Sequence, residues 1–94
     1  MKNGRVLSMP KVFSDIAFAD YIEWQSSDKN TWQKINALIK SIERDGAMKG
    51  IGKPEKMKYE KGKYSRRIDH ANRLVYQVSD DIITILSCKG HYEN

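Results

Sequence analysis

The hydrophobic periodicity of this chain changes at the glycine-rich segment 46–52, and this change constrains the fold more than any other feature. Upstream, apolar residues recur at the i, i+3, i+4, i+7 spacing of an amphipathic helix. Downstream, short runs alternate between apolar and polar residues, which is the period of a half-buried strand. A chain of 94 residues that passes from helical to strand periodicity predicts a single α+β domain.

Two helices are expected upstream of the glycines. The first follows Ser14, a favourable N-cap, and runs to about Gln25. The second begins after Asp28, which can cap it, and ends at Asp45-Gly46, because glycine readily adopts the left-handed conformation. The apolar positions predicted for the first helix are Phe18, Tyr21 and Ile22, flanked by Ala17 and Trp24, and those for the second are Ile35, Leu38, Ile39 and Ile42.

Three strand-like segments follow the glycines, at 63–69, 73–78 and 82–88. The first two alternate in polarity, and the third is rich in β-branched residues. Asp80-Asp81 between the last two is a hairpin signal. Before the helices, Pro10 lies in an extended segment and lacks an N–H, so this segment suits a sheet edge or a strand start.

Alternation assigns faces to the strand residues. With Leu74 directed at the helices, a three-residue loop pairs it with Ile68. The same register pairs Asp69 with Arg73. Arg67, Asp69 and Arg73 are then predicted on the face opposite the helices.

The last strand should carry the chain end towards these arginines. Regular pairing places Cys88 beside Arg73, with His91 just past the end of the strand. Gly90 allows a bulge or bend at this point. The pairs predicted across the final hairpin are Tyr76 with Ile85 and Val78 with Ile83.

Composition narrows the possible partners and the cellular setting. Seventeen Lys and Arg against 12 Asp and Glu leave a formal charge of +5 and a pI near 9.4, which favours polyanionic partners. Cys88 is the only cysteine, so we expect no internal disulfide, no cysteine-based zinc site and a reducing cytoplasm. The sequence has no apolar run long enough for a membrane span. Residues 1–8 are expected to form a disordered extension before a domain at 9–94.

Five polar residues could together cleave RNA without a metal ion: Glu55, Arg66, Arg67, Arg73 and His91. Attack by a 2′-hydroxyl needs a base for its proton, a cation on the phosphate and an acid for the 5′-oxygen. Histidine exchanges protons near neutral pH, and arginine binds phosphate with a planar fork of N–H groups. No cofactor or metal is therefore expected.

Each of these residues also has an ordinary interpretation. A histidine near the C-terminus is commonly a surface residue, and a carboxylate such as Glu55 is common in loops. Arg66 and Arg67 could instead form ion pairs with Asp69 and Glu60 on an unremarkable strand. Residue chemistry alone therefore supports a basic α+β domain with a candidate RNA site.

The order and spacing of several short stretches from Met9 to Tyr92 resemble the YoeB (Txe) family of bacterial toxins, within the RelE superfamily. The stretches that carry the resemblance are Tyr21-Ile22-Glu23-Trp24-Gln25, Lys34-Ile35-Asn36, Gly52-Lys53-Pro54-Glu55, Tyr64-Ser65-Arg66-Arg67-Ile68, Arg73-Leu74-Val75-Tyr76 and His91-Tyr92. The resemblance implies a microbial-ribonuclease (RelE-like) α+β fold, with two N-terminal helices packed on a twisted antiparallel β-sheet.

The same resemblance implies a ribosome-dependent endoribonuclease that cleaves translated mRNA and is neutralised by a YefM-like antitoxin. Operator DNA would be bound through the antitoxin complex, and a homodimer is possible. The family's catalytic residues match Glu55 as base, His91 as acid and Arg73 on the phosphate. Its RNA- or phosphate-binding residues match Lys58, Arg67 and Tyr92, while Lys89-Gly90 departs from the arginine and aromatic that relatives often carry.

Two other classes of function compete with this one. A toxin of related fold could inhibit DNA gyrase by protein contact, but it would not need Glu55, Arg73 and His91 together. A noncatalytic nucleic-acid-binding module would bind RNA or DNA and leave it intact. Integrity of the bound RNA separates that module from a nuclease.

Overall fold

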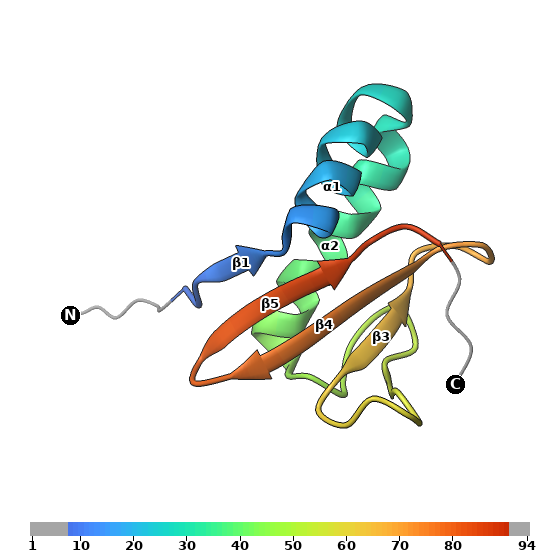
Figure 1. The fold of residues 1–94 in the computed structure, drawn as a ribbon. Helices are drawn as coiled ribbons and strands as arrows, with labels where there is room; N and C mark the ends of the chain where they lie inside the picture. The colour runs from blue at the N-terminus through green and yellow to red at the C-terminus, as the bar shows by residue number, and fades with distance from the viewer. Residues whose placement is uncertain (1–7, 91–94) are drawn as a thin grey trace.

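The computed structural model describes residues 8–90, so the predicted extension, apart from Ser8, and the predicted site residues His91 and Tyr92 lie outside the described residues. The elements in chain order are β1 (Lys11–Phe13), α1 (Asp15–Ser27), α2 (Lys29–Asp45), β2 (Glu55–Lys56), β3 (Tyr64–Arg67), β4 (Arg73–Ser79) and β5 (Ile82–Ser87). Both helices lie on one face of the sheet and leave the other face without a helix (Figure 1). This arrangement confirms the predicted α+β class.

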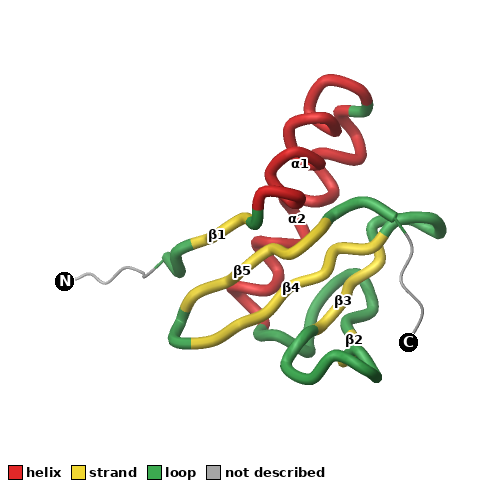
Figure 2. The backbone as a smooth tube through the Cα atoms, viewed as in Figure 1, coloured by secondary structure: helices red, strands yellow, loops and turns green. Residues whose placement is uncertain are grey.

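The sheet has five strands in the order β1-β5-β4-β3-β2, which Figure 2 shows as a twisted layer in front of the helices. Neighbouring strands are antiparallel except β1 and β5, which run parallel. The predicted antiparallel sheet is thus confirmed for β2 to β5, and β1 adds a parallel pair at the sheet edge that was predicted for the Pro10 segment. A parallel pair needs a long crossover, and the two helices with the rest of the sheet supply it.

The helix boundaries follow local capping. Ser14 Oγ accepts a hydrogen bond from Ala17 N at 3.0 Å, and it also donates to Leu86 O at 2.9 Å, which ties the start of α1 to the last strand. Asp28 caps α2 by accepting from Thr31 N and Thr31 Oγ1, at 3.2 and 2.8 Å. Gly46 ends α2 at the predicted position, but its φ of 101° and ψ of 173° lie outside the left-handed helical region that was expected.

The core lies between the helices and the sheet, and the predicted apolar face of α2 is buried in it. For α1 the prediction was partly wrong, since the inward residues are Ala17, Tyr21 and Trp24, whereas Phe18 and Ile22 are exposed. Apolar residues lie all round α1, so periodicity alone does not select its buried face. The buried cluster consists of Ala17, Ile35, Leu38, Ile39, Ile42, Ile68, Leu74, Tyr76, Ile83, Ile85 and Cys88.

The pairing of β3 with β4 differs from the prediction by two residues. Arg67 lies opposite Arg73 and Arg66 opposite Leu74, so the predicted partners Ile68 and Asp69 belong to the connecting turn. The Asp69 carboxylate closes this turn by accepting hydrogen bonds from the backbone N–H groups of Ala71 and Asn72, both at 2.8 Å. A shift of two residues preserves the faces, so Arg67 and Arg73 lie on the helix-free face as predicted.

The last hairpin forms as predicted at its turn and departs from the prediction further along. Asp80 and Asp81 take φ values of 53° and 61°, and the pairs Tyr76–Ile85 and Val78–Ile83 are present. An irregularity then makes Ser87, and not Leu86, the partner of Val75. The extra residue reverses the faces beyond it, so Cys88 is buried in the core and is not the neighbour of Arg73.

Gly90 takes the place predicted for Cys88 beside Arg73. Its carbonyl oxygen accepts a hydrogen bond from Arg73 N at 2.9 Å, and its N–H donates to Asn72 Oδ1 at 2.8 Å. Its φ of 93° confirms the predicted bend. Within residues 8–90, no helix is both long and apolar enough to cross a membrane.

Candidate active site on the helix-free face

Three of the predicted site residues come together on the helix-free face, from three adjacent strands. Arg67 and Arg73 are direct partners across β3 and β4, and Glu55 is the partner of Ser65 across β2 and β3. Arg73 Nη1 lies 2.9 Å from Glu55 Oε1 and 3.3 Å from Ser65 Oγ. The sheet thus brings a carboxylate and two guanidinium groups to one place from positions far apart in the sequence.

Glu55 was interpreted as a loop residue, but it lies in the two-residue strand β2. Strand pairing gives the Glu55 backbone a defined partner in Ser65. The residues that lead from the glycine-rich segment to Glu55 are also fixed by a backbone hydrogen bond. Arg67 N donates to Gly52 O at 2.7 Å, and Lys53 then takes a φ of 52° before Pro54. The carboxylate is therefore presented from an ordered backbone.

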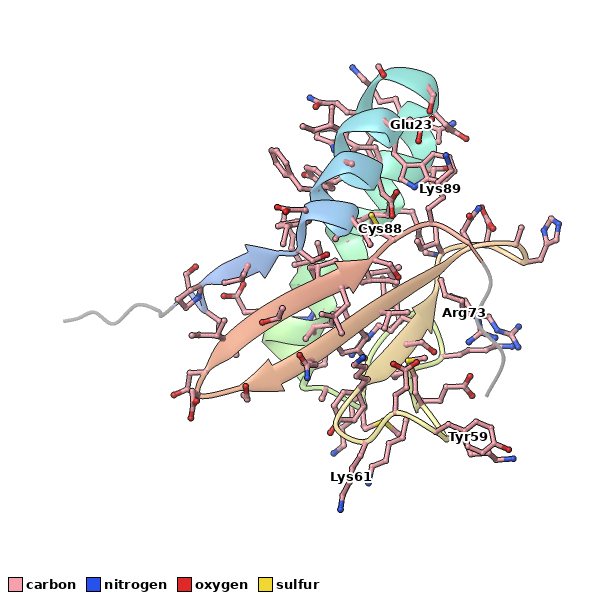
Figure 3. The ribbon with its side chains drawn as sticks, in the orientation of Figure 1. Glu23, Tyr59, Lys61, Arg73, Cys88 and Lys89 are labelled. Carbon is pink, nitrogen blue, oxygen red and sulfur yellow. The ribbon has the colours of Figure 1, made fainter. Side chains whose placement is uncertain are left out.

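The two charges of the ion pair differ in exposure. The Arg73 side chain is 13% exposed, whereas that of Glu55 is 50% exposed. Both Arg73 contacts use Nη1, and a guanidinium carries five N–H donors in a planar fork. Arg73 can therefore hold Glu55 and still offer donors to an anion, while the exposed carboxylate remains accessible to a substrate hydroxyl. Figure 3 shows the Arg73 side chain beside the edge of β3.

Arg67 supplies the second positive charge of the candidate site. Its side chain is exposed, and no ion pair within residues 8–90 engages it. The alternative pairing of Arg66 and Arg67 with acidic neighbours is absent from this range, since Asp69 caps its own turn and Glu60 pairs with Lys63 at 2.7 Å. An exposed guanidinium opposite Arg73 is well placed to bind a phosphate.

Lys58 lies in the connection after β2, beside a basic cleft of about 460 Å³. Four lysines line this cleft together with apolar groups, and the Lys58 ammonium lies 5.7 Å from the centre of the exposed Tyr59 ring. Figure 3 shows Tyr59 and Lys61 projecting outward from this part of the chain. The cleft-lining residues are Lys56, Met57, Lys58, Lys61, Gly62, Lys63 and Tyr64.

His91 and Tyr92, the remaining predicted site residues, lie outside the described residues. The last described residue, Gly90, is hydrogen bonded to the backbone of Arg73. Within residues 8–90 no group of three or more His, Cys, Asp or Glu side chains is arranged to hold a metal ion.

Two residues acquired roles that the sequence had not assigned to them. Ser65 contacts Arg73 diagonally across β3 and β4, and it could be found only once the register of these two strands was known. Arg66 was considered for phosphate binding, but it is fully buried on the helix side, where Tyr76 and backbone carbonyls surround it. The alternation of β3 already indicated this side, because Arg66 and Tyr64 share a face.

The chain is similar to bacterial toxins over most of its length. Residues 13–92 match the family described as YoeB-like toxin of bacterial type II toxin-antitoxin system. The toxin YoeB of Escherichia coli K12 is 44% identical over 85 residues, which cover 89% of this chain and 100% of that protein. The toxin YoeB of Synechocystis is 43% identical over 86 residues, which cover 90% of this chain and 99% of that protein.

Solved structures agree with this comparison. The YoeB dimer from Staphylococcus aureus superposes with a TM-score of 0.86 at 54% identity, covering 89% of this chain and 98% of that one. YoeB in the heterotetrameric YoeB-YefM toxin-antitoxin complex from Staphylococcus aureus gives a TM-score of 0.84 at 54% identity, covering 92% of this chain and all of that one. A YoeB/ParE toxin from Agrobacterium tumefaciens gives a TM-score of 0.84 at 37% identity, covering 89% of this chain and 100% of that one.

Proposed function

Because this chain belongs to the YoeB family of bacterial type II toxins, we propose that it is a ribosome-dependent endoribonuclease that cleaves translated mRNA by metal-free acid–base catalysis. The observation that carries the proposal is the contact of Glu55 with Arg73 beside Arg67. A carboxylate and two guanidinium groups on one face are the base and the phosphate-binding cations that this reaction needs.

In the proposed reaction, Glu55 takes the proton of a ribose 2′-hydroxyl, and the resulting oxygen attacks the adjacent phosphorus. Arg73 and Arg67 stabilise the negative charge that accumulates on the phosphate oxygens. His91 gives a proton to the 5′-oxygen as its bond to phosphorus breaks. The products are a 2′,3′-cyclic phosphate, which water can open to a 3′-phosphate, and a fragment with a free 5′-hydroxyl.

The contact between Glu55 and Arg73 supports this division of roles. Arg73 holds one carboxylate oxygen at 2.9 Å, which leaves the other oxygen to accept the hydroxyl proton. The same Nη1 also lies 3.3 Å from Ser65 Oγ, which gives the guanidinium a second contact. Two groups held in this way need little reorganisation when charge develops on the phosphate.

His91 follows directly on Gly90, whose carbonyl accepts from Arg73 N. This adjacency in the chain supports its assignment as the acid at the same phosphate. Tyr92 is proposed to stack on a base, as aromatic side chains do with unpaired nucleotides. Lys58 and the neighbouring lysines of the basic cleft are proposed to bind phosphates further along the strand.

The partners of this toxin are proposed by analogy with its relatives. Staphylococcus aureus YoeB has been solved as a dimer and in complex with YefM. For this chain we propose a YefM-like antitoxin whose acidic segment covers the basic site and folds on binding. We further propose binding to operator DNA through that complex, a homodimer and a cytoplasmic location.

The proposal is tested by analysis of the RNA ends. Purified toxin is mixed with ribosomes stalled on a defined message, and the cleaved fragments are examined for their terminal groups. We expect a 5′-hydroxyl that polynucleotide kinase can label directly and a 2′,3′-cyclic phosphate that resists periodate until it is removed. A 5′-phosphate with a free 3′-hydroxyl, or intact message despite binding, would overturn the proposal, and the second result would favour a noncatalytic module.

A further inference from the structure

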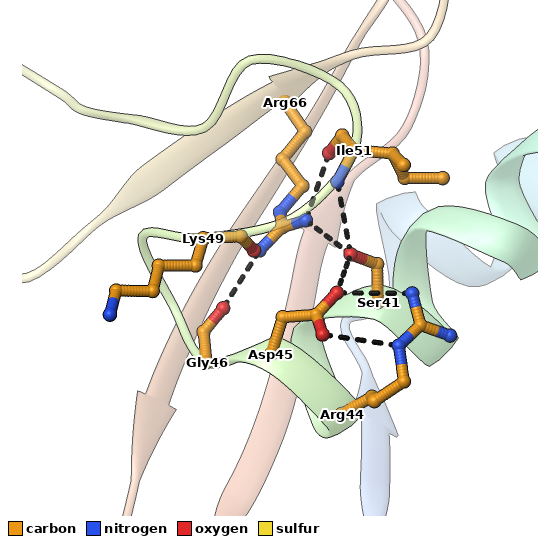
Figure 4. A network of polar contacts seen from close by, with 7 residues as sticks. All are labelled: Ser41, Arg44, Asp45, Gly46, Lys49, Ile51 and Arg66. Carbon is orange, nitrogen blue, oxygen red and sulfur yellow. Dashed lines mark hydrogen bonds and ion pairs between the residues drawn. The ribbon is translucent and has the colours of Figure 1, made fainter.

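Arg66 lies in the interior of the protein without an acidic partner in direct contact within residues 8–90. Its side chain is fully buried, and its guanidinium donates to the carbonyl oxygens of Gly46, Lys49 and Ile51 at 2.8, 2.6 and 2.9 Å (Figure 4). It also donates to Ser41 Oγ at 2.9 Å. Three of its five bonds thus hold the backbone of one segment, 46–52, that contains no helix or strand.

Several groups around Arg66 offset the free-energy cost of burying its charge. Its Cζ lies 5.6 Å from the centre of the Tyr76 ring, and Nε donates to the Tyr76 hydroxyl at 2.9 Å. Burial raises the pKa of that hydroxyl, so it stays protonated and donates in turn to Ala47 O at 2.6 Å. Asp45 lies behind Ser41, and its pKa is lowered by hydrogen bonds from Arg44 and Ser41 and also by the charge of Arg66. The C-terminal end of α2 adds a partial negative charge.

The segment packs too closely on this cluster to accept side chains at two of its glycines. A Cβ on Gly50 would lie 2.1 Å from Ser41 Oγ and 2.6 Å from Asp45 Oδ2. A Cβ on Gly52 would lie 2.6 Å from Leu38 Cδ2 and 3.1 Å from Arg66 Cβ. Both glycines have positive φ, of 106° and 88°. The backbone of the segment is therefore defined by contact with Arg66 and its neighbours.

This segment leads directly to the proposed base. Gly52 O accepts from Arg67 N at 2.7 Å, and Glu55 follows three residues later. Successive residues of β3 thus lie on opposite faces of the sheet. Arg66 contacts the segment on the helix side, and Arg67 is exposed on the helix-free face. A displacement of the segment would move Glu55 relative to Arg73.

We propose that Arg66 is a positioning residue that fixes segment 46–52 and thereby sets the place of the Glu55 carboxylate relative to Arg67 and Arg73. This inference rests on the proposed nuclease function, because it gives Glu55 its task. Lysine at this position keeps the charge, but its ammonium has three N–H donors on one nitrogen, so it cannot satisfy three carbonyls and the Tyr76 hydroxyl at once.

The test uses Arg66→Lys, with Tyr76→Phe as a milder variant that removes only the hydroxyl between Nε and the Ala47 carbonyl. Tyr21→Phe is the matched control, since it removes a tertiary hydrogen bond of 2.7 Å to Asn36, far along the chain from the segment. Single-turnover cleavage of ribosome-bound message and amide hydrogen exchange are measured for each. We expect Arg66→Lys to lower the cleavage rate about 10- to 100-fold with unchanged affinity for the ribosome complex, since a misplacement of about 1 Å can cost about 10²-fold.

Hydrogen exchange should be faster in 46–55 for Arg66→Lys and Tyr76→Phe, and parental there for Tyr21→Phe. A double-mutant cycle with Glu55→Gln provides the decisive comparison. If Arg66 acts through Glu55, Arg66→Lys should have little further effect once Glu55 is replaced. Multiplicative losses in the cycle, or a parental rate despite faster exchange, would overturn the inference. If Arg66→Lys does not fold, the same criteria apply to Tyr76→Phe.

The two proposals fail in different ways. A parent protein that folds and binds ribosomes without cleaving RNA refutes the nuclease function. Unchanged exchange in 46–55 for the folded variants refutes the holding role of Arg66, whatever the activity of the parent.

Discussion

Replacing Glu55 by glutamine removes the proposed base and retains the shape of the side chain. The amide oxygen can still accept a hydrogen bond from Arg73 Nη1, which now lies 2.9 Å from a carboxylate oxygen. What disappears is the negative charge and the ability to take a proton. The variant therefore separates a chemical role of Glu55 from a structural one.

The structure allows the two effects to be compared in size. An ion pair with a partner as exposed as Glu55 typically contributes about 0–1 kcal/mol to stability. For a domain of this length, about 1 kcal/mol corresponds to about 4–8 °C in melting temperature. Loss of a general base typically lowers the rate about 10²–10⁴-fold, which is about 2.7–5.4 kcal/mol at about 1.36 kcal/mol per decade. The loss of activity should thus far exceed the loss of stability.

The assay is single-turnover cleavage of ribosome-bound message, with thermal unfolding followed in parallel. A message with a 5′-thio leaving group at the cleavage site separates the base from the acid, because sulfur leaves without protonation. His91→Gln should recover much of its rate on this substrate, and Glu55→Gln should not. The assignment is refuted if Glu55→Gln cleaves within about tenfold of the parent, below the range for a lost base, or if both variants recover equally.

Arg73→Ala should mainly lower the cleavage rate, because Arg73 is held against Glu55, whereas Arg67→Ala should also weaken RNA binding; parental rates and binding for both would place the phosphate grip elsewhere. Lys61→Ala should reduce the steepness with which the logarithm of RNA affinity falls against the logarithm of salt concentration, by about 1. Lys40→Ala on α2 is the control and should leave this slope unchanged. Equal slopes for both variants and the parent would show that the basic cleft does not contact RNA. Burial, with a smaller contribution from Asp20, raises the pKa of the Cys88 thiol from 9.0 to about 12, so a thiol reagent at neutral pH should modify only unfolded protein. Because that pKa is raised on folding, the associated stability is complete below about pH 9 and is lost as the pH rises towards 12, and rapid labelling of the native protein would contradict the buried position.

Local chemistry determined the helices and the identity of most strands. Ser14, Asp28 and Gly46 act through backbone groups within a few residues, so their capping roles could be predicted from sequence. The buried face of α2 followed from its periodicity, whereas that of α1 did not, because Phe18 and Ile22 are as apolar as the residues that face inward. The faces of Arg67 and Arg73 were also predictable, since alternation survives a register shift of two residues.

The candidate site itself was only partly predictable. The resemblance to a toxin family assigned Glu55, Arg67 and Arg73, and the structure brings these three together. The contact of Ser65 with Arg73 depends on the register of β3 with β4, which was predicted two residues away from its observed position. The place of Glu55 depends on strand β2, whose two residues carry no alternating pattern of their own. The catalytic and phosphate-binding roles of Glu55, Arg67 and Arg73 remain predictions, as do the roles of Lys58, His91 and Tyr92.

Sequence by itself thus determined the helices, their caps, most of the strands and the sides on which Arg67 and Arg73 lie, because those depend on neighbours along the chain. Only the tertiary structure decided the parallel pairing of β1, the turn closed by Asp69 and the irregularity before Ser87. It also decided that Arg66 is buried on the helix side, where its guanidinium holds segment 46–52. These features depend on which backbone groups, distant in the sequence, form hydrogen bonds with one another, and no local sequence pattern specifies those pairs.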